Sequence, residues 1–350
     1  MLFWLRHTFQ RLRRRRGQGF SVVLMALFIA FMGNTACYLY FDGAVKPELT
    51  VWDAFWYSTI SIATIGYGDY FAVTTGGRIG VIVFVLGMGL TSFTALLGMM
   101  VDRMMQINFK ELHGMATVHS KDHILLINFP DAVRVEQIIE ELRRDVEYKE
   151  RDVVIVAESL DTLPFEKPDI FFVKGSPLQA DTLQRAGLER ASLAMVLADS
   201  SNPSSDGLVA AIINLLEHLR PDVKTVAECL DSRHDILFRS TRCDSIVYTH
   251  RILNNLLVQE VQDAGVAAVL SELTANESKS GFYACHAEAT PEVTYLEMAK
   301  SMTDKGERLI AVTRDHKNHV MLNGLRSQKD DVVVYIGDRR RSWSDLAQGK

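Results

Sequence analysis

Two long runs without a charged side chain lie in the first third of the chain. They cover residues 20–41 and residues 79–101, which are 22 and 23 positions. A helix needs about 20 mostly apolar residues to cross the hydrocarbon core of a bilayer. The pattern therefore predicts a membrane domain over residues 20–101, with an outer helix at 20–41 and an inner helix at 79–104.

Between these runs, residues 51–63 begin with aromatic side chains and end with hydroxyl side chains. Trp52, Trp56 and Tyr57 stand near the start of this segment, and Thr59 and Ser61 stand near its end. The segment is too short to span a bilayer, so it predicts a half-length helix that stops near the bilayer centre. Residues 64–69 would then be non-helical backbone at membrane depth, which is tolerated only inside protein or facing water.

Beyond residue 101 the pattern becomes that of a soluble protein. Residues 102–122 read as a polar, partly helical linker, and short aliphatic runs then alternate with amphipathic stretches over residues 123–249. The predicted strands are 124–128, 153–157, 170–173, 193–198, 225–229 and 245–248, and the predicted helices are 133–146, 180–186, 207–219 and 235–239. This alternation predicts an α/β Rossmann-type domain, a parallel sheet with helices on both faces.

The last hundred residues predict two smaller parts. Residues 250–280 contain two helices with one apolar face, formed by Ile252, Leu256, Leu257 and Val261. Strands are predicted at 309–312, 320–322 and 332–336, which makes residues 281–350 a small α+β lobe.

Charge is distributed unevenly, so the net charge of −5 says little about partners. The basic segment, residues 1–19, contains no acid in its first 16 positions but six arginines: Arg6, Arg11, Arg13, Arg14, Arg15 and Arg16. Such clusters stay on the cytoplasmic side of a membrane, so two spans predict a multi-pass protein of the cell (inner) membrane with both termini cytoplasmic. Apolar residues between the arginines leave open whether this segment lies on anionic lipid headgroups or is solvated.

A basic start before an apolar run is also typical of a secretory signal, and Cys37 raises the alternative of a lipoprotein. Asn34 stands where a lipoprotein signal needs an aliphatic residue, so we expect the first span to be retained. The four cysteines, Cys37, Cys229, Cys243 and Cys285, lack C-x-x-C spacing and predict free thiols rather than disulfides or zinc. His316 and His319 fall in an expected turn, and we expect no metal there.

The strongest motif follows the half-length helix: Thr64, Ile65, Gly66, Tyr67, Gly68 and Asp69. Gly66 and Gly68 can adopt backbone angles closed to other residues, which helps successive carbonyls point toward one axis. Backbone carbonyls that replace an ion's hydration shell form the filters of K⁺ channels. Gly-Tyr-Gly alone also fits a tight turn, but between two spans these residues predict a K⁺ selectivity filter.

In such a filter K⁺ is expected at Thr64, Ile65, Gly66 and Tyr67, with Asp69 at the outer mouth. One chain cannot enclose a non-helical loop at membrane depth. We therefore expect a homotetramer in the lipid bilayer, with the inner helix lining the pore.

Glycines interrupt the inner helix at mid-length, where Gly87 and Gly89 flank one methionine. They predict a gating hinge, although small residues in membrane helices also permit close packing. Phe93, Leu97 and Val101 follow at a spacing of one face and predict an apolar gate that lines the pore. The alternative for that face is contact with lipid or another helix.

Residues 61–70 and 85–89 resemble the two-transmembrane K⁺ channels of prokaryotes that carry a carboxyl-terminal RCK (regulator of K⁺ conductance) domain. Residues 172–177, 183–188, 194–199 and 226–228 are similar to the amino-terminal lobe of RCK domains, and the resemblance extends over about residues 20–337. It implies that residues 250–280 are crossover and dimerisation helices and that residues 281–350 form the carboxyl-terminal lobe. It further implies a ligand-gated channel with a gating ring, no enzyme activity and no nucleic-acid partner. Soluble copies starting at Met115 would bring the ring to about eight RCK domains.

The Rossmann-type domain departs from the dinucleotide fingerprint after its first strand. Residues 128–133 read Asn-Phe-Pro-Asp-Ala-Val and contain none of the three glycines that let a pyrophosphate approach the backbone. An adenine nucleotide such as NAD or ADP nevertheless remains an open gating ligand. Its candidate residues are Asn128, Asp131, Glu158, Gly175, Ser176 and Asp199, although RCK domains usually have Asp in place of Ser176.

Some RCK relatives are gated by Ca²⁺, and the resemblance implies Asp206 and Glu228 as candidate Ca²⁺ ligands. Leu230 stands where such a relative has a second acid. Because Ca²⁺ takes about six to eight oxygen ligands, two carboxylates are an incomplete site unless carbonyls or another subunit contribute. Surface acids without a ligand are the alternative.

Two other functions stay open at this point. One is a membrane-tethered, dinucleotide-dependent enzyme or redox sensor, which the missing glycines disfavour. The other is a constitutively open K⁺ channel with a structural ring.

Overall fold

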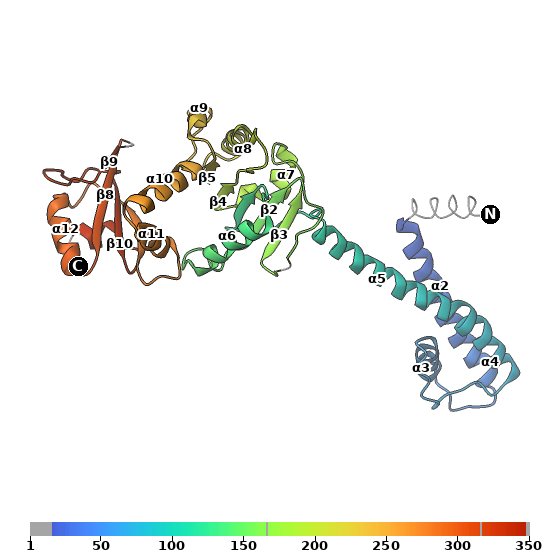
Figure 1. Cartoon of the computed structure of the whole chain (residues 1–350). Coiled ribbons are helices and arrows are strands. Elements are labelled where there is room, and N and C mark those ends of the chain that lie inside the picture. The colour runs from blue at the N-terminus through green and yellow to red at the C-terminus, as the bar shows by residue number, and fades with distance from the viewer. Residues whose placement is uncertain (1–15, 166, 316, 348–350) are drawn as a thin grey trace. The chain divides into compact units, whose positions relative to one another are not determined.

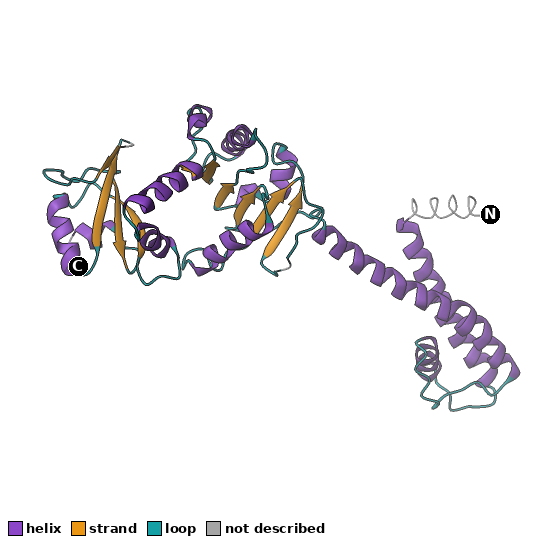
Figure 2. Cartoon of the chain, in the orientation of Figure 1, coloured by secondary structure: helices purple, strands orange, loops and turns teal. Residues whose placement is uncertain are grey.

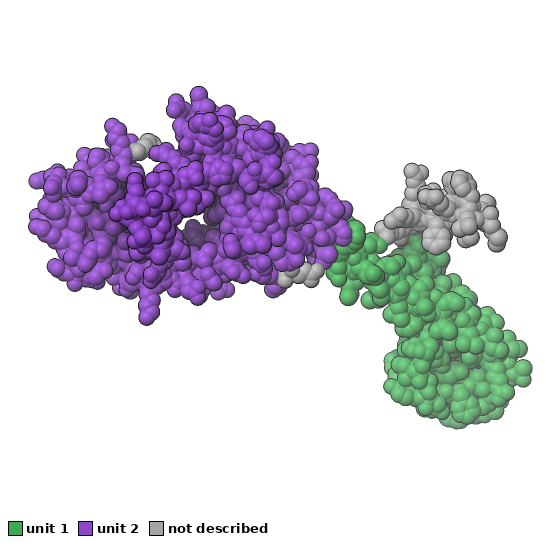
Figure 3. Space-filling model, in the orientation of Figure 1, with its two compact units in different colours: residues 1–110 green, residues 111–350 purple. Residues whose placement is uncertain are grey.

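A computed structural model describes residues 16–165, 167–315 and 317–347. The chain divides into two compact units, residues 1–110 and residues 111–350, which are coloured separately in Figure 3. The arginines predicted to set the topology lie mostly in residues 1–15 and thus outside the described residues, as does His316.

The first unit consists of helices (Figure 1). Helix α2 covers Arg16–Asp42 and helix α3 covers Val51–Ile62. Helix α4 (Thr75–Gly80), the π-helical segment η1 (Val81–Leu90) and helix α5 (Thr91–Leu112) follow one another without a break. Two helical stretches, Gly19–Asp42 and Thr75–Leu112, are long and apolar enough to cross a membrane.

The second of these stretches is longer than the predicted inner helix at 79–104. Its 38 residues correspond to about 57 Å, whereas the hydrocarbon core is about 30 Å thick. It begins early because the Thr74 side chain caps it by accepting a hydrogen bond from Gly77 N at 3.0 Å. It ends before Gly114, whose φ of 62° suits a helix terminus.

Asp42, at the end of α2, is completely buried and ties that helix to the start of α4. Its carboxylate accepts hydrogen bonds from Val73 N at 2.7 Å and from the Thr74 hydroxyl at 2.9 Å. Gly77 packs so closely that an added Cβ would lie 1.8 Å from Asp42 Oδ2. The two spanning helices are therefore joined by buried polar contacts at one end.

Helix α3 is fixed at both its start and its middle. Thr50 and Asp53 form a capping box, in which each side chain bonds the other's backbone N–H. In the middle, the buried Ser58 hydroxyl accepts hydrogen bonds from Asn34 Nδ2 at 2.8 Å and from the Thr35 hydroxyl at 3.0 Å. These contacts hold the half-length helix against α2.

The second unit begins with a six-stranded parallel sheet in the order β3-β2-β1-β4-β5-β6. Figure 2 distinguishes the strands of this unit from its helices by colour. Its strands are β1 (Ile124–Ile127), β2 (Val153–Ala157), β3 (Ile170–Lys174), β4 (Leu193–Val196), β5 (Lys224–Cys229) and β6 (Ser245–Tyr248). The connecting helices are α6 (Ala132–Arg144), α7 (Ala180–Arg185), η2 (Leu188–Arg190), α8 (Ser205–Leu219), η3 (Ser232–His234) and α9 (Asp235–Phe238). Every residue of β1 and β2 is buried, as expected for a sheet covered on both faces. The predicted Rossmann-type fold is confirmed.

The carboxyl-terminal lobe has an antiparallel sheet in the order β7-β10-β8-β9. Its elements are β7 (Gly281–His286), α12 (Tyr295–Asp304), β8 (Arg308–Arg314), β9 (Lys317–His319), β10 (Val332–Gly337) and α13 (Trp343–Ala347). The strand predicted at 320–322 is wrong, because the chain reverses at Asp315 (φ 48°) and pairs again at once through Thr313 and Asn318.

Helices α10 (Thr249–Gln262) and α11 (Val266–Thr274) contain no buried residue. Several of their apolar side chains are exposed, among them Leu257 at 59 % and Val261 at 87 %. Clustered exposed apolar side chains are typical of a protein interface.

A buried ion pair stabilises the carboxyl-terminal lobe. Asp331 is 2 % exposed and accepts two hydrogen bonds from the Arg314 guanidinium and one from the Tyr295 hydroxyl, all at 2.7 Å. Burial alone would raise the pKa of the Asp331 carboxyl, but these bonds outweigh it, so its pKa lies below the usual range.

Asp331→Asn should destabilise this lobe, because removing one partner of a buried pair costs about 3–5 kcal/mol. Hydrogen exchange of the full chain should show faster exchange in β8 and β10, whereas the exposed neighbour variant Asp330→Asn should behave as the wild type. Since the folded pKa of Asp331 is lowered, its contribution is complete above the unfolded pKa of about 3.9 and is lost as the pH falls through the folded pKa. Equal exchange in the two variants at neutral pH would contradict the assignment.

Candidate functional site

The loop after α3 alternates between two backbone conformations. Thr64, Gly66 and Gly68 have positive φ angles of 61°, 55° and 80°, and the residues between them do not. An alternation of this kind lets successive carbonyls point toward one side of the chain. A β-branched residue such as Thr64 rarely adopts a positive φ, so the loop is held in a strained conformation of the kind found at functional sites.

Amides at the start of this loop are hydrogen-bonded to α3, whereas the carbonyls that follow are not. Ile65 N and Gly66 N both donate to Ile60 O, at 2.9 and 3.2 Å, which fixes the loop to the end of α3. Within the described part of the chain, no hydrogen bond reaches the carbonyl oxygens of residues 64–67. A row of free, parallel carbonyl dipoles can replace water around a cation.

Aromatic side chains brace the far end of the loop. Trp56 Nε1 donates to Asp69 Oδ2 at 2.9 Å, and the Trp56 ring stacks on the Tyr67 ring with a centroid separation of 6.1 Å. The Tyr70 hydroxyl donates to Asp53 Oδ1 at 2.8 Å. The residues predicted as the filter are thus held together by contacts to the half-length helix.

The two glycines of the inner helix lie in different surroundings. Both fall in the π-helical segment η1, a helix type that often marks functional sites. Gly89 is buried, and an added Cβ would lie 2.8 Å from Ile62 Cγ1 and 2.9 Å from Phe84 O. Gly87 is exposed, and the nearest atom to an added Cβ would be Ile82 O at 3.4 Å. Gly89 therefore has a packing role that Gly87 lacks.

The three residues predicted as the gate also differ. Phe93 packs against a buried cluster that includes Ile62 and Val85, whereas Leu97 and Val101 are 47 % and 58 % exposed in the single chain. Leu97 and Val101 are thus free to face a pore or lipid.

In the second unit, strand register brings the predicted nucleotide residues to one edge. Ile127 of β1 pairs with Val156 of β2 and with Val196 of β4, and Ala157 pairs with Lys174 of β3. Asn128, Glu158 and Gly175 come directly after these strands, Ser176 comes one residue later, and Asp199 lies three residues after Val196. All of them therefore follow the carboxyl ends of parallel strands, where such folds bind ligands.

The crevice between β1 and β4, where the strand order reverses, is bridged by the chain's own side chains. Asn128, with a φ of 72°, donates from Nδ2 to Leu197 O at 2.8 Å. Asp131 caps α6 by accepting from Arg134 N at 2.9 Å. A capping carboxylate at this helix start repels phosphate, so a nucleotide bound at this edge would hold its phosphates away from the start of α6.

The other candidates at this edge are more open. Glu158 is exposed, and its carboxylate has no hydrogen bond within the described residues. Gly175 has a φ of 155°, and an added Cβ would lie 2.6 Å from the Thr182 hydroxyl oxygen. Ser176 is half-buried, whereas Asp199 Oδ1 already accepts bonds from Ser201 N and the Ser201 hydroxyl.

The carboxylate oxygens of the predicted Ca²⁺ ligands already accept hydrogen bonds from groups of the same chain. Asp206, 4 % exposed, accepts from Leu230 N at 2.8 Å and Asp231 N at 3.0 Å, and His234 Nδ1 lies 2.7 Å from its Oδ2. Burial alone would raise the pKa of Asp206, but these bonds hold it below the usual range. Glu228, 6 % exposed, accepts from Arg134 Nη2 at 2.5 Å and from Ala198 N at 2.9 Å.

As they lie, Asp206 and Glu228 do not fit Ca²⁺, because every carboxylate oxygen already accepts a hydrogen bond. Among the residues that the structure describes, no group of three His, Cys, Asp or Glu side chains is arranged to hold a metal ion.

Arg134 is a residue of this edge that the sequence analysis missed. It lies in the first turn of α6, where the helix dipole disfavours a cation. The signal available in the sequence was an arginine three residues after the N-cap Asp131. A cation is unfavourable at a helix start, so its presence there suggests a carboxylate partner elsewhere in the chain.

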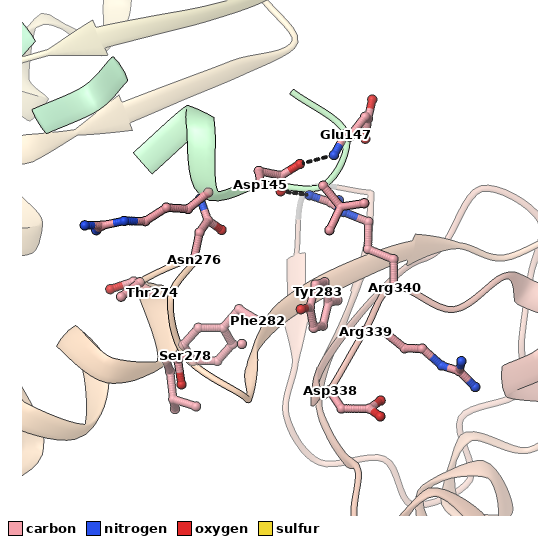
Figure 4. A pocket seen from close by; sticks show the side chains of 15 residues that line it. Asp145, Glu147, Thr274, Asn276, Ser278, Phe282, Tyr283, Asp338, Arg339 and Arg340 are labelled. Atoms are coloured by element: carbon pink, nitrogen blue, oxygen red, sulfur yellow. Dashed lines mark hydrogen bonds and ion pairs between the residues drawn. The ribbon is translucent and has the colours of Figure 1, made fainter. Parts of the chain in front are cut away.

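A cavity of about 540 Å³ lies between the carboxyl end of α6 and the carboxyl-terminal lobe (Figure 4). Arg340 reaches across it to Asp145 with a nitrogen–oxygen distance of 3.1 Å, and Asp145 also accepts from Glu147 N. Asn276 N donates to the Glu141 carboxylate at 3.0 Å. These contacts join the two lobes of this unit.

Comparisons with known proteins divide the chain at the same place as the structure. A family described as "Ion channel" matches residues 20–106. A family described as "Calcium-activated potassium channel slowpoke-like RCK domain" matches residues 119–216.

Among relatives, YugO of Bacillus subtilis, named as a potassium channel protein, is 24 % identical over 219 residues. That match covers 62 % of this chain and 65 % of YugO, so the chain spans just under two thirds of this relative. The calcium-gated potassium channel TvoK of Thermoplasma volcanium is 22 % identical over 304 residues, which are 85 % of this chain and 84 % of TvoK. A solved structure of the GsuK channel bound to NAD aligns over 94 % of this chain and 58 % of that one, at 15 % identity and a TM-score of 0.46.

Gly89→Ala should destabilise the first unit more than Gly87→Ala does. A Cβ at position 89 overlaps Ile62 and the Phe84 carbonyl, and overpacking costs about 1–3 kcal/mol. A Cβ at position 87 has room, and alanine in a helix gains about 0.5–1 kcal/mol over glycine. Thermal unfolding of the two variants in the same detergent measures the difference, and an equal or reversed order would contradict the packing role of Gly89.

Proposed function

Because this chain belongs to the potassium channels that combine an ion-channel module with an RCK domain, we propose that it conducts K⁺ selectively as a homotetramer. In this proposal an intracellular ligand binds the RCK domains, which form a gating ring and pull on the inner helices. The observation that carries the proposal is the loop at residues 64–69, with its alternating positive φ angles and free carbonyls.

The homotetramer is supported by the lack of hydrogen-bond partners for the loop carbonyls within the described residues. Carbonyls at membrane depth need a partner, and a single chain supplies only one wall of a cation site. Several copies around one axis would complete the coordination of K⁺ by Thr64, Ile65, Gly66 and Tyr67. The inner helix would line the pore, with Gly87 and Gly89 in the flexible region and Phe93, Leu97 and Val101 toward the gate.

The membrane orientation follows from the charge pattern. The arginine-rich start of the sequence favours a cytoplasmic amino terminus. Two spanning helices then bring the RCK domain to the cytoplasmic side of the cell (inner) membrane, where intracellular ligands reach it.

The ring is supported by the exposed apolar face of α10 and α11, which a second copy would cover. Moving a pore from about 1 % to 99 % open needs about 5.5 kcal/mol of differential binding. If soluble copies from Met115 bring the ring to about eight domains, each supplies about 0.7 kcal/mol. Weak ligand sites are then sufficient.

Two ligand classes are candidates, Ca²⁺ and an adenine nucleotide such as NAD or ADP. TvoK is named a calcium-gated channel, which makes Ca²⁺ a candidate here through Asp206 and Glu228. The contacts favour the nucleotide, because Glu158 is free to accept ribose hydroxyls while the oxygens of Asp206 and Glu228 are occupied. Gly175 and Ser176 stand beside it at the end of β3.

The alternative of an enzyme or redox sensor has less support. The glycine fingerprint of dinucleotide enzymes is absent from residues 128–133. Burial and the nearby Asp206 raise the pKa of the Cys229 thiol to about 12, so it stays protonated and poorly reactive at neutral pH. Burial likewise raises the pKa of Cys243 and Cys285.

Purified protein in liposomes should show K⁺ flux that exceeds Na⁺ flux and that changes when an adenine nucleotide is added. Gly66→Ala should abolish selective flux, because alanine at a φ of 55° adds strain of about 1–2 kcal/mol to a loop that already holds Thr64 in this region. Gly98→Ala, at an open position in α5, is the matched control and should keep it.

The outcomes separate the candidate functions. Absence of K⁺-selective flux under every condition would refute the channel. Flux that ignores both Ca²⁺ and nucleotides would favour a constitutively open channel with a structural ring.

The proposed ring is tested by a variant in the apolar face of α10. Leu257→Glu should weaken association of the RCK domains, because it places a charge in the apolar face of α10 that is 59 % exposed in the single chain. Asn255→Glu, about 200° around the same helix, is the matched control. Mass measurement in mild detergent should show smaller assemblies for Leu257→Glu only; unchanged mass would exclude this face from the interface.

A further inference from the structure

The carboxyl edge of the parallel sheet is rich in acids. Asp131, Glu158, Asp199, Asp206 and Glu228 follow or end the strands there, or begin the helices that come next. Such an edge attracts cations. Within the described residues, Glu228 forms an ion pair with a cationic side chain of its own chain.

That cation is Arg134, which joins three elements. From the first turn of α6 its Nη2 lies 2.5 Å from Glu228 Oε1 in β5, and its Nη1 lies 3.3 Å from Ala198 O at the end of β4. The second oxygen of Glu228 accepts from Ala198 N at 2.9 Å. The Arg134 side chain is 34 % exposed, whereas the Glu228 side chain is 7 % exposed.

The groups that Arg134 contacts are the groups a calcium ion prefers. A carboxylate oxygen and a backbone carbonyl oxygen are hard oxygen ligands. Arg134 neutralises the Glu228 carboxylate and donates a hydrogen bond to the Ala198 carbonyl. Because Arg134 is part of the same chain, this contact has no entropic cost of association, unlike the binding of a free ion. A divalent ion would have to displace it and then sit beside its positive charge.

We propose that Arg134 is a tethered cation which takes the place of a soluble divalent cation at Glu228 and so determines that this edge does not respond to Ca²⁺. Asp206 is closed in the same way by Leu230 N, Asp231 N and His234. The inference rests on the proposed function in one respect, since it names which ligand class the ring rejects. Ca²⁺ binding is measured without any flux, so failure of this inference and failure of the channel are distinguishable.

Arg134→Gln should create a Ca²⁺ site, because it leaves the Glu228 carboxylate without its cation and adds an amide oxygen beside it. Isothermal titration of CaCl₂ into full-length, chelator-stripped protein should show a gain of one site per chain over the wild type. Arg144→Gln, in the last turn of the same helix, where Arg144 pairs with Glu141 and Glu277, is the matched control and should show no gain. The double variant Arg134→Gln, Glu228→Gln should lose the new site.

Equal Ca²⁺ stoichiometry of Arg134→Gln and wild type would overturn the proposal. Should Arg134→Gln fail to fold, Glu228→Gln alone decides it in the otherwise natural protein. Unchanged Ca²⁺ stoichiometry in Glu228→Gln supports the tethered cation, and a lost site overturns it.

Discussion

Free backbone carbonyls at membrane depth are the constraint on which the first unit depends. An unpaired polar group in hydrocarbon costs several kcal/mol, so such a loop exists only where a partner replaces water. In the loop at residues 64–69 the first amides are hydrogen-bonded to the end of α3 and, within the described residues, the carbonyls of residues 64–67 accept no hydrogen bond. The half-length of α3, its capping box, its anchoring to α2 through Ser58 and the bracing of Asp69 by Trp56 all serve to hold this loop in place.

In the second unit, by contrast, many polar groups at the sheet edge are hydrogen-bonded within the chain. Asn128 donates to the Leu197 carbonyl across the β1–β4 crevice, and Arg134 pairs with Glu228. Residues 128–133 at this edge lack the glycine fingerprint, and Arg134 occupies the position beside Glu228. The open groups that remain, Glu158 and Gly175, lie toward β2 and β3.

Much of this was predictable from the sequence, because the signals are local. Apolar runs give the spans, Gly66 and Gly68 give the positive φ angles, and alternating strands and helices give the Rossmann-type sheet. What the sequence could not show depends on long-range pairing. Gly89 packs on Ile62 and Glu228 meets Arg134 across 94 positions, and no local pattern reports either contact.

The carboxyl-terminal lobe shows the same limit. Strand β7 was not predicted, because exposed and buried residues alternate only weakly along it. The apolar residues after His319 suggested a strand at 320–322, but the turn at Asp315 places β9 before them. Turn geometry, rather than hydrophobicity, decides the register there.

The most direct test of K⁺ selectivity is the reversal potential of the purified full-length protein in a planar bilayer with KCl on one side and NaCl on the other. A hundredfold preference for K⁺ predicts a reversal potential displaced from zero by about 120 mV toward the K⁺ equilibrium potential. A reversal potential near zero would contradict the assignment of residues 64–69 as the filter.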